Sequence, residues 1–143
     1  MTLVVDASVA LKWLVDEVHR DHAVAVLARK EPLLAPPHFR IELVSAVMKK
    51  VRAGDLQRAT IAENLAAIAN APVREISGRS LHAPAMEIAL RFYRSIYDSL
   101  YVALALQERC QLVTADRKLY DAVAPHYAGT MLWIEAVPPA PGP

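Results

Sequence analysis

The sequence predicts a single α/β domain built around a parallel β-sheet. Short runs rich in Val, Ile and Leu alternate with longer segments of helical periodicity, which is typical of a sheet buried on both faces. The chain has 143 residues, of which 55% are hydrophobic, so it is long enough for one domain with a sizeable core. No internal repeat or linker divides the sequence.

Five short apolar runs are expected to be the strands of this sheet. They are Leu3–Val5, Leu33–Ala35, Val73–Ile76, Gln111–Thr114 and Met131–Ile134. Between the first two runs, the segments "SVALKWLVDE" and "HRDHAVAVLARK" predict two helices. The next helix is expected in "HFRIELVSAVMKKVRAG", where apolar residues recur at helical spacing and Gly54 ends the helix.

Further helices complete the expected order of elements. The segment "DLQRATIAENLAAIANAP" predicts a helix that Asp55 caps and Pro72 ends. After the third strand, a helix in "APAMEIALRFYRS" begins near Pro84, and another in "DSLYVALALQER" follows it directly. We expect the domain to span residues 1–137 and the Pro-rich residues 138–143 to be disordered.

The composition argues against a polyanion held by overall charge. The 16 basic and 15 acidic residues give a formal net charge of +1, so nucleic acid would have to be held by a local patch. The single cysteine, Cys110, excludes an internal disulfide and suits a reducing compartment. Because we find no secretory signal and no apolar segment of membrane-spanning length, we expect a cytoplasmic protein.

Two acidic residues closely follow predicted strands. Asp6 comes after the first strand and Asp116 after the fourth, and parallel strands bring their carboxyl ends, where ligands bind, to one edge of the sheet. An ionised carboxylate beside an apolar core costs free energy unless something pairs with it. For Asp116, a cap of the short helix "RKLYDAV" is an equally good interpretation.

Two more acids lie on helices that are expected to be largely buried. Glu42 belongs to a narrow polar stripe with His38, Ser45 and Lys49 at helical spacing. The stripe is either exposed, with a weak ion pair from Glu42 to Lys49 or Arg40, or directed at a cavity. Asp98 opens an Ala- and Leu-rich helix, where an N-cap is the default interpretation and a role in a site is compatible with it.

Convergence of these four carboxylates would create a metal site. Like charges held together raise each other's pKa values and destabilise the fold, and a divalent cation removes that repulsion. A site of carboxylate oxygens suits Mg²⁺ or Mn²⁺, and no Cys or His cluster argues for zinc. The five histidines, at positions 19, 22, 38, 82 and 126, lack ligand spacing and are interpreted as surface or helix-face residues.

Four stretches of the sequence together carry a family resemblance. They are "VVDASVALKWL", "PPHFRIELVSAVMKKV", "YDSLYVALAL" and "LVTADRKLYDAV", and they span nearly the whole chain. In this order they resemble PIN-domain ribonucleases, specifically the VapC-type toxins of bacterial toxin–antitoxin pairs. The resemblance implies a PIN-like three-layer α/β/α fold with a five-stranded parallel sheet, and a metal-dependent endoribonuclease that hydrolyses RNA.

The resemblance also implies a catalytic site of four acids: Asp6, Glu42, Asp98 and Asp116. The metal ligands among them would be Asp6, Asp98 and Asp116, with Mg²⁺ or Mn²⁺ as the cofactor. Glu42 would hold or deprotonate the attacking water. Ser8 and Thr114 match hydroxyl positions that support the acids, and Ser45 stands where the family commonly has Asn.

Partners are indicated less strongly. The candidate phosphate contacts are Lys12, Arg40, Arg91, Arg94, Arg117 and Lys118. Lys12 and Arg117 are favoured because each closely follows an acidic strand end. The family also implies a cognate VapB-type antitoxin and a homodimer.

Some support for a homodimer comes from large apolar residues on helices whose polar faces are too narrow for a lone small domain. These residues are Trp13, Leu14, Phe39, Phe92 and Tyr93. Packing into the core of the domain is an equally good interpretation of them.

The residues themselves leave two other classes of function open. One is a phosphatase or phosphotransferase with Asp6 as the nucleophile, although Ser8 stands where such enzymes place a second carboxylate. The other is a non-catalytic α/β protein-binding domain whose acids are helix caps. Titration with Mn²⁺ separates these classes, because the ion stabilises a nuclease that binds it and leaves a domain of helix caps unchanged.

Overall fold

The strands form one parallel sheet in the computed structural model, which describes residues 2–139 and 141. The strands are β1 (Leu3–Val5), β2 (Leu33–Ala35), β3 (Val73–Glu75), β4 (Gln111–Thr114) and β5 (Met131–Trp133). Their order in the sheet is β3-β2-β1-β4-β5, and each neighbouring pair is parallel. All five predicted strands are confirmed, with β3 and β5 one residue shorter than expected.

The described residues contain seven α-helices and three 3₁₀ turns. The helices are α1 (Ala7–Leu14), α2 (Arg20–Leu27), α3 (Phe39–Arg52), α4 (Ile61–Asn70), α5 (His82–Phe92), α6 (Ile96–Glu108) and α7 (Arg117–Val123). The 3₁₀ turns are η1 (Arg58–Thr60), η2 (Arg79–Leu81) and η3 (Ile134–Ala136).

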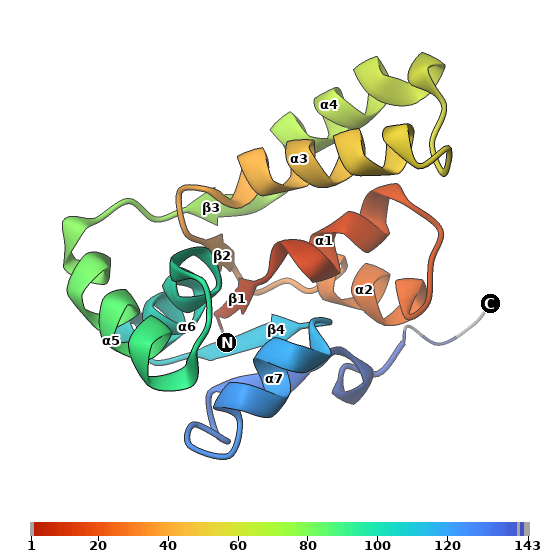
Figure 1. The fold of residues 1–143 in the computed structure, drawn as a ribbon. Coiled ribbons are helices and arrows are strands. Elements are labelled where there is room, and N and C mark those ends of the chain that lie inside the picture. The colour runs from red at the N-terminus through yellow and green to blue at the C-terminus, as the bar shows by residue number, and fades with distance from the viewer. Residues whose placement is uncertain (1, 140, 142–143) are drawn as a thin grey trace.

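Helices cover both faces of the sheet and produce the expected three-layer α/β/α arrangement. In the view of Figure 1, α3 and α4 lie above the sheet, α7 lies below it, and α5 and α6 lie at the left. The central helix is α6, which packs against both β1 and β4. Its Tyr101, Val102 and Leu104 are completely buried, and each such side chain contributes about 1.5–3 kcal/mol of hydrophobic stabilisation.

The strand order places a topological switch point between β1 and β4. From β1 the chain moves outward to β2 and β3, and it then returns to the other side of β1 as β4. Ligands of open α/β sheets bind beyond the carboxyl ends of the strands at such a point. Asp6 follows β1 directly and Asp116 comes two residues after β4, so the two acids flank the switch point.

Helix caps confirm one predicted role of an acid and correct another. Asp116 caps α7, because its Oδ1 accepts hydrogen bonds from the amides of Lys118 at 3.1 Å and Leu119 at 3.2 Å. Asp98 does not cap α6. Ser95 is the cap, and its hydroxyl accepts the Asp98 amide at 3.0 Å, since serine competes well for the N-cap position when an acid follows three residues later.

The turn after α3 contains one confirmed and one wrong prediction. Gly54 has a φ of 83°, a left-handed conformation that ends the helix as expected. Asp55 belongs to the same turn, since its amide donates to the Lys50 carbonyl at 2.9 Å. It does not cap α4, which begins at Ile61 after the intervening turn η1.

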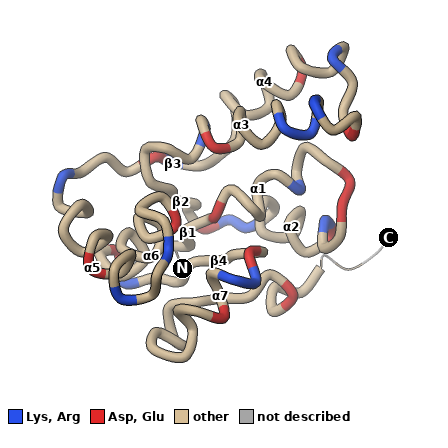
Figure 2. Tube along the Cα trace, viewed as in Figure 1, with Lys and Arg blue, Asp and Glu red and all other residues tan. Residues whose placement is uncertain are grey.

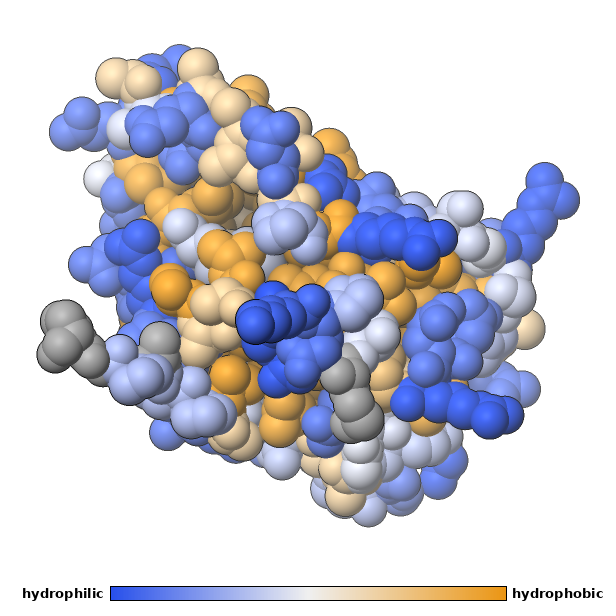
Figure 3. Space-filling model, turned by 180° about the vertical axis from the view of Figure 1, so that it is seen from behind, coloured by the Kyte–Doolittle hydropathy of each residue, from blue (hydrophilic) through white to orange (hydrophobic). Residues whose placement is uncertain are grey.

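Most of the aromatic and apolar residues considered for a dimer interface lie inside the domain. Phe39 belongs to the core, and Trp13, Leu14 and Phe92 pack against it. Only Tyr93 of this group is strongly exposed, at 91%. Other exposed large apolar residues are Val18, Val24, Ile41, Met48, Leu65, Met86, Leu90 and Tyr97. Seen from behind, hydrophobic residues are concentrated in the middle of the surface (Figure 3).

The C-terminal part of the described chain packs on the domain through Ile134 and Val137, which are buried. The disordered tail expected at 138–143 lies partly outside the described residues. None of the helices in the described ranges has the length and hydropathy needed to cross a membrane.

The conformation of Gly54 leads to a stability prediction. Gly54→Ala is expected to lower the free energy of unfolding by about 1 kcal/mol, because an L side chain is strained at positive φ, while no atom lies within 4 Å of the new Cβ. Gly129→Ala is the matched control, since that site is equally open and lacks a positive φ. Denaturant unfolding that gave the same change for both variants would contradict the prediction.

Candidate active site

Asp6 is the buried carboxylate at the switch point, with 5% of the residue exposed. Its Oδ2 accepts hydrogen bonds from the Ser8 hydroxyl at 2.8 Å and the Thr114 hydroxyl at 2.7 Å. Burial raises the pKa of Asp6 to about 6, the two hydroxyls oppose that rise, and the charges of Glu42 and Asp98 add to it. The ionised carboxylate is therefore destabilised where it stands.

The two hydroxyls also connect the end of β1 to the end of β4. Thr114 Oγ1 accepts the amide of Asp116 at 3.0 Å, and Ser8 Oγ accepts the amide of Ala115 at 3.0 Å. Ser8 and Thr114 thus orient both Asp6 and the main chain that carries Asp116. These hydrogen bonds are consistent with the expected role of Ser8 and Thr114, which is to support the acidic residues of the site.

Glu42 lies in the first turn of α3 and is held from two sides. The Tyr101 hydroxyl of α6 donates to Glu42 Oε1 at 2.7 Å, and His38 Nε2 lies 2.9 Å from the same oxygen. Burial, followed by the charges of Asp6 and Glu42, raises the pKa of Tyr101, so its hydroxyl remains a donor. The ion pair with Lys49 that the sequence left open is not formed among the described residues.

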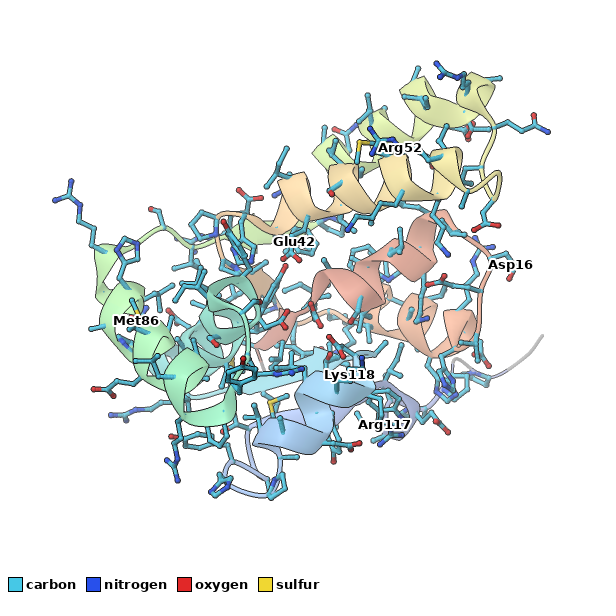
Figure 4. All side chains as sticks on the ribbon, viewed as in Figure 1. Asp16, Glu42, Arg52, Met86, Arg117 and Lys118 are labelled. Carbon is cyan, nitrogen blue, oxygen red and sulfur yellow. The ribbon has the colours of Figure 1, made fainter. Side chains whose placement is uncertain are left out.

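Asp98 brings the fourth carboxylate to the same edge from the first turn of α6. Burial raises its pKa, and the charges of Asp116 and Glu42 raise it further. The four acids therefore interact electrostatically although they come from four separate parts of the chain. Figure 2 shows acidic positions from these elements around the open edge of the sheet, and Figure 4 shows Glu42 above that edge and Lys118 below it.

An open groove of about 360 Å³ lies beside this acidic edge. Its lining residues are His38, Ile41, Glu42, Ser45, Ser95, Tyr97 and Asp98. Two of the four acids line it, so a substrate in the groove can reach them. A larger cavity of about 620 Å³, beside Asp16 and α2, contains none of the four acids.

The donor set fits a hard divalent cation, and three of its four acids have no ion-pair partner in the described part of the chain. Among the described residues, no lysine, arginine or histidine forms an ion pair with Asp6, Asp98 or Asp116. Carboxylate oxygens are the ligands that Mg²⁺ and Mn²⁺ prefer.

The cage for such an ion is not closed in this conformation. No three His, Cys, Asp or Glu side chains of the described chain stand close enough together to chelate one ion. One oxygen each of Asp6, Asp116 and Glu42 is engaged by a protein donor. The second oxygen of each carboxylate would be the one available to a cation.

The candidate phosphate contacts differ from one another in burial and in the groups that they contact. Lys12 is 6% exposed, and its Nζ pairs with Glu17 at 3.2 Å, which corrects its prediction as a surface contact. Arg40 donates to three main-chain carbonyls near the end of α4 and is structural. Arg117 remains exposed at the start of α7, with its Cζ 3.9 Å from the ring centroid of Trp133.

Sequence reasoning missed two residues that hold Glu42. His38 was interpreted as a surface or helix-face residue, yet only 12% of its side chain is exposed. Its i, i+4 spacing to Glu42 was the available signal. Tyr101 gave no signal of its own, because it looks like any aromatic residue of a buried helix until α6 is placed against α3.

Comparison with known proteins identifies related chains. The family model of the PIN domain matches residues 3–124. Ribonuclease VapC3 of Mycobacterium tuberculosis is 33% identical over 120 residues, which cover 84% of this chain and 86% of that protein.

Three solved structures share the fold. PAE2754 from Pyrobaculum aerophilum matches with a TM-score of 0.69 and 23% identity over 94% of this chain and 90% of that one. Mycobacterium tuberculosis VapC20, a sarcin-ricin loop cleaving toxin, matches with a TM-score of 0.62 and 22% identity, over 85% and 95% of the two chains. A toxin–antitoxin complex from Klebsiella pneumoniae matches with a TM-score of 0.60 and 12% identity, over 91% and 95%.

The surroundings of Asp6 predict a pH-dependent cost to stability. The folded pKa of about 6 lies above the ordinary value of 3.8 for an aspartate, so the folded state binds more protons between these values and stability falls as pH rises through this window. The cost is fully present above pH 6 and corresponds to about 3 kcal/mol. Asp6→Asn is therefore expected to raise the free energy of unfolding at pH 7 in EDTA, with the gain disappearing toward pH 4.

Denaturant unfolding at pH 4, 5, 6 and 7 measures this effect. Asp55→Asn, a change at an exposed carboxylate whose side chain is 58% accessible, is the control and should show no such window. An Asp6→Asn variant that is less stable than the parent at every pH would show that the hydrogen bonds of Asp6 outweigh the cost of its charge.

Proposed function

The chain belongs to the PIN-domain family, among its VapC-type ribonucleases, and we propose that its acidic edge hydrolyses RNA phosphodiester bonds with Mg²⁺ or Mn²⁺. Asp6, Glu42, Asp98 and Asp116 are the proposed catalytic residues, and Asp6, Asp98 and Asp116 are the proposed metal ligands. One observation carries the assignment: Asp6 is buried beside other carboxylates, and no basic side chain of the described residues pairs with it.

The proposed reaction is addition of water to the phosphorus of the RNA backbone. A divalent cation at the site supplies positive charge that offsets carboxylate repulsion, activates water and polarises the phosphate. As the water oxygen bonds to phosphorus, the bond from phosphorus to the leaving sugar oxygen breaks, and that oxygen takes up a proton.

Glu42 is the proposed acceptor of the proton that the attacking water loses. Its Oε1 is occupied by Tyr101, whereas Oε2 makes no hydrogen bond or ion pair with any described residue, so a lone pair remains free in a side chain that lines the groove. Proton transfer by a positioned base contributes about 10²- to 10⁴-fold to a rate. Ser8 and Thr114 hold Asp6 in a single orientation and so reduce the reorganisation that binding requires.

Family membership favours the nuclease over the two classes that the residues alone left open. A phosphatase with an aspartyl nucleophile accounts for Asp6. A non-catalytic domain of helix caps accounts for Asp116, which caps α7. Neither accounts for the gathering of four carboxylates at one edge of the sheet, where the charges of the others raise the pKa values of Asp6 and Asp98.

We further propose a cognate VapB-type antitoxin that covers the acidic edge. The groove beside the acids has exposed apolar side chains, with Ile41 at 65% and Tyr97 at 58%. An antitoxin segment with an apolar face could pack against the exposed apolar side chains of the groove. One basic residue of that segment could pair with the unpaired carboxylates. A buried basic residue of the antitoxin would then take the place of the cation and inhibit the enzyme. The cytoplasm is the proposed location, because RNA is the proposed substrate.

A homodimer is proposed through the outer face of α5. Met86 and Leu90 lie one turn apart on α5, and Tyr93 directly follows its end. The three residues are exposed by 55%, 76% and 91%. Exposed apolar patches of this kind are typical of protein–protein interfaces. A second copy of the chain packed on this face would remove these apolar side chains from water.

Loss of one metal ligand is expected to abolish cleavage without unfolding the protein. Asp98→Ala should lower the metal-dependent rate of RNA cleavage by at least roughly 100-fold, measured with a fluorescent RNA oligonucleotide in Mn²⁺. Asp55→Asn serves as the control for a contaminating ribonuclease. Equal activity of the wild type and Asp98→Ala would contradict the proposal that the acidic edge is the catalytic site.

Metal binding is also expected to stabilise the fold. Mn²⁺ at 100 times its dissociation constant should add about 2.7 kcal/mol to the stability of the wild type, seen as a higher Tm. The Asp98→Ala variant should show a much smaller rise. A wild type whose Tm does not respond to Mn²⁺ or Mg²⁺ would contradict the proposed site.

A charged substitution on the exposed face of α5 tests the proposed homodimer. Leu90→Glu should convert the dimer to a monomer in sedimentation velocity experiments, because a carboxylate at the centre of the face is costly to bury. Leu65→Glu on α4 is the control, as Leu65 is also partly exposed, at 42%. A wild type that sediments as a monomer at micromolar concentration would contradict the proposal.

A further inference from the structure

Resting on the proposed function, we propose that His38 is a positioning residue for the reaction. In this proposal, its Nε2 acts with the Tyr101 hydroxyl on Glu42 Oε1 and leaves Oε2 as the oxygen that works on the water. The two contacts approach the same atom from different elements, at 2.9 Å from His38 and 2.7 Å from Tyr101. His38 precedes α3, and Tyr101 lies on α6.

Within the part of the chain that the structure describes, Glu42 is the one acidic partner that contacts the His38 ring. Both ring nitrogens are inaccessible to solvent, and neither makes a well-aligned hydrogen bond with any described residue. Burial of unpaired polar atoms is costly, and a ring at the start of a helix normally avoids it by facing solvent. The close contact with Glu42 Oε1 is the interaction that can offset this cost.

The short distance allows a hydrogen bond only if the proton is on Nε2. A carboxylate oxygen accepts hydrogen bonds, so in this proposal Nε2, 2.9 Å from Oε1, is the protonated nitrogen. The N–H does not yet point along the line to Oε1, which is why the pair meets the distance of a hydrogen bond without its angle. Contacts of this kind in ligand-free enzymes commonly become aligned when substrate binds.

Two aromatic rings hold the imidazole in place. The Tyr101 ring lies at 5.0 Å between centroids with an interplanar angle of 69°, and the Tyr97 ring lies at 5.4 Å with an angle of 56°. Tyr97 and His38 also line the groove beside the acids. The ring can therefore rotate slightly to align its N–H while its overall position is fixed by packing.

Two donors on one oxygen have a defined effect on the carboxylate. They fix its plane, and they occupy the lone pairs of Oε1 so that proton transfer is directed to Oε2. His38 lines the groove, but both its ring nitrogens are inaccessible to solvent, so in this scheme its polar atoms act only through Glu42. Its loss should therefore reduce kcat and leave KM nearly unchanged, because RNA binding does not depend on it.

Two substitutions separate the donor from the packing. His38→Phe keeps an aromatic ring between Tyr97 and Tyr101 but removes the nitrogen, whereas His38→Gln loses the ring and can place an amide N–H where Nε2 stands. We expect His38→Phe to lower kcat about 10- to 100-fold, as loss of an orienting partner commonly does, with KM changed by less than a factor of about two. His38→Gln should stay within a few-fold of the wild type.

The control is His82→Phe, a change at an exposed histidine on α5, which should leave both constants unchanged. Circular dichroism checks folding. If His38→Phe does not fold, Tyr101→Phe carries the same test, because it removes only the other donor to Oε1 and should likewise reduce kcat and spare KM.

The inference is overturned if His38→Phe has the kcat of the wild type, or if His38→Gln is as slow as His38→Phe, since packing alone would then explain the residue. An equal effect on kcat and KM would also overturn it. These results leave the proposed function intact, because the wild type remains an active, metal-dependent ribonuclease. A wild type that cleaves no RNA with either metal overturns the proposed function and this inference together.

Discussion

The burial of one carboxylate at the end of the central strand is the constraint on which the rest of the site depends. Asp6 directly follows β1, which has strands on both sides, and only 5% of the residue is exposed. Two hydroxyls satisfy one of its oxygens, but hydroxyls compensate little of a full charge. The folded state therefore contains a negative charge that it does not neutralise, and the hydrophobic core has to stabilise the fold against that cost.

The topology determines which other groups share this position. The strand order reverses between β1 and β4, which is where open α/β sheets bind their ligands, and the main chain after β4 brings Asp116 to this position. The buried helix α6 packs against both strands and carries Asp98 in its first turn. Glu42 arrives from α3, where Tyr101 of α6 holds it. A local reversal of topology thus collects acids that are far apart along the chain.

The same repulsion that weakens the fold favours a cation. Neighbouring carboxylates raise the pKa values of Asp6 and Asp98, so the free energy lost to repulsion without metal becomes part of the driving force for binding it. The hydrogen bonds on Asp6, Asp116 and Glu42 engage one oxygen each and leave the other without a protein partner. Such a site is oriented in advance but not closed, and it illustrates how function can retain groups that lower stability.

The sequence by itself determined the elements and the candidate acids, because both are local signals. Runs such as Leu3–Val5 and Gln111–Thr114 identified the strands to within a residue. An acidic residue that directly follows a predicted strand can also be recognised in the sequence. Caps were less certain, since Ser95 and Asp98 compete for one helix end and only the path of the backbone decides between them.

The tertiary structure alone decided the partners of those acids. Lys12 is a candidate phosphate contact by sequence and is buried against Glu17. His38 shares a polar stripe with Glu42 by sequence, but only the structure shows that the two side chains are in contact. Tyr101 is 59 residues from Glu42 along the chain, yet it donates to its carboxylate. Side-chain periodicity states which face of an element is apolar, but it does not state which element packs against that face. Contacts between distant residues therefore exist only once the helices are docked on the sheet.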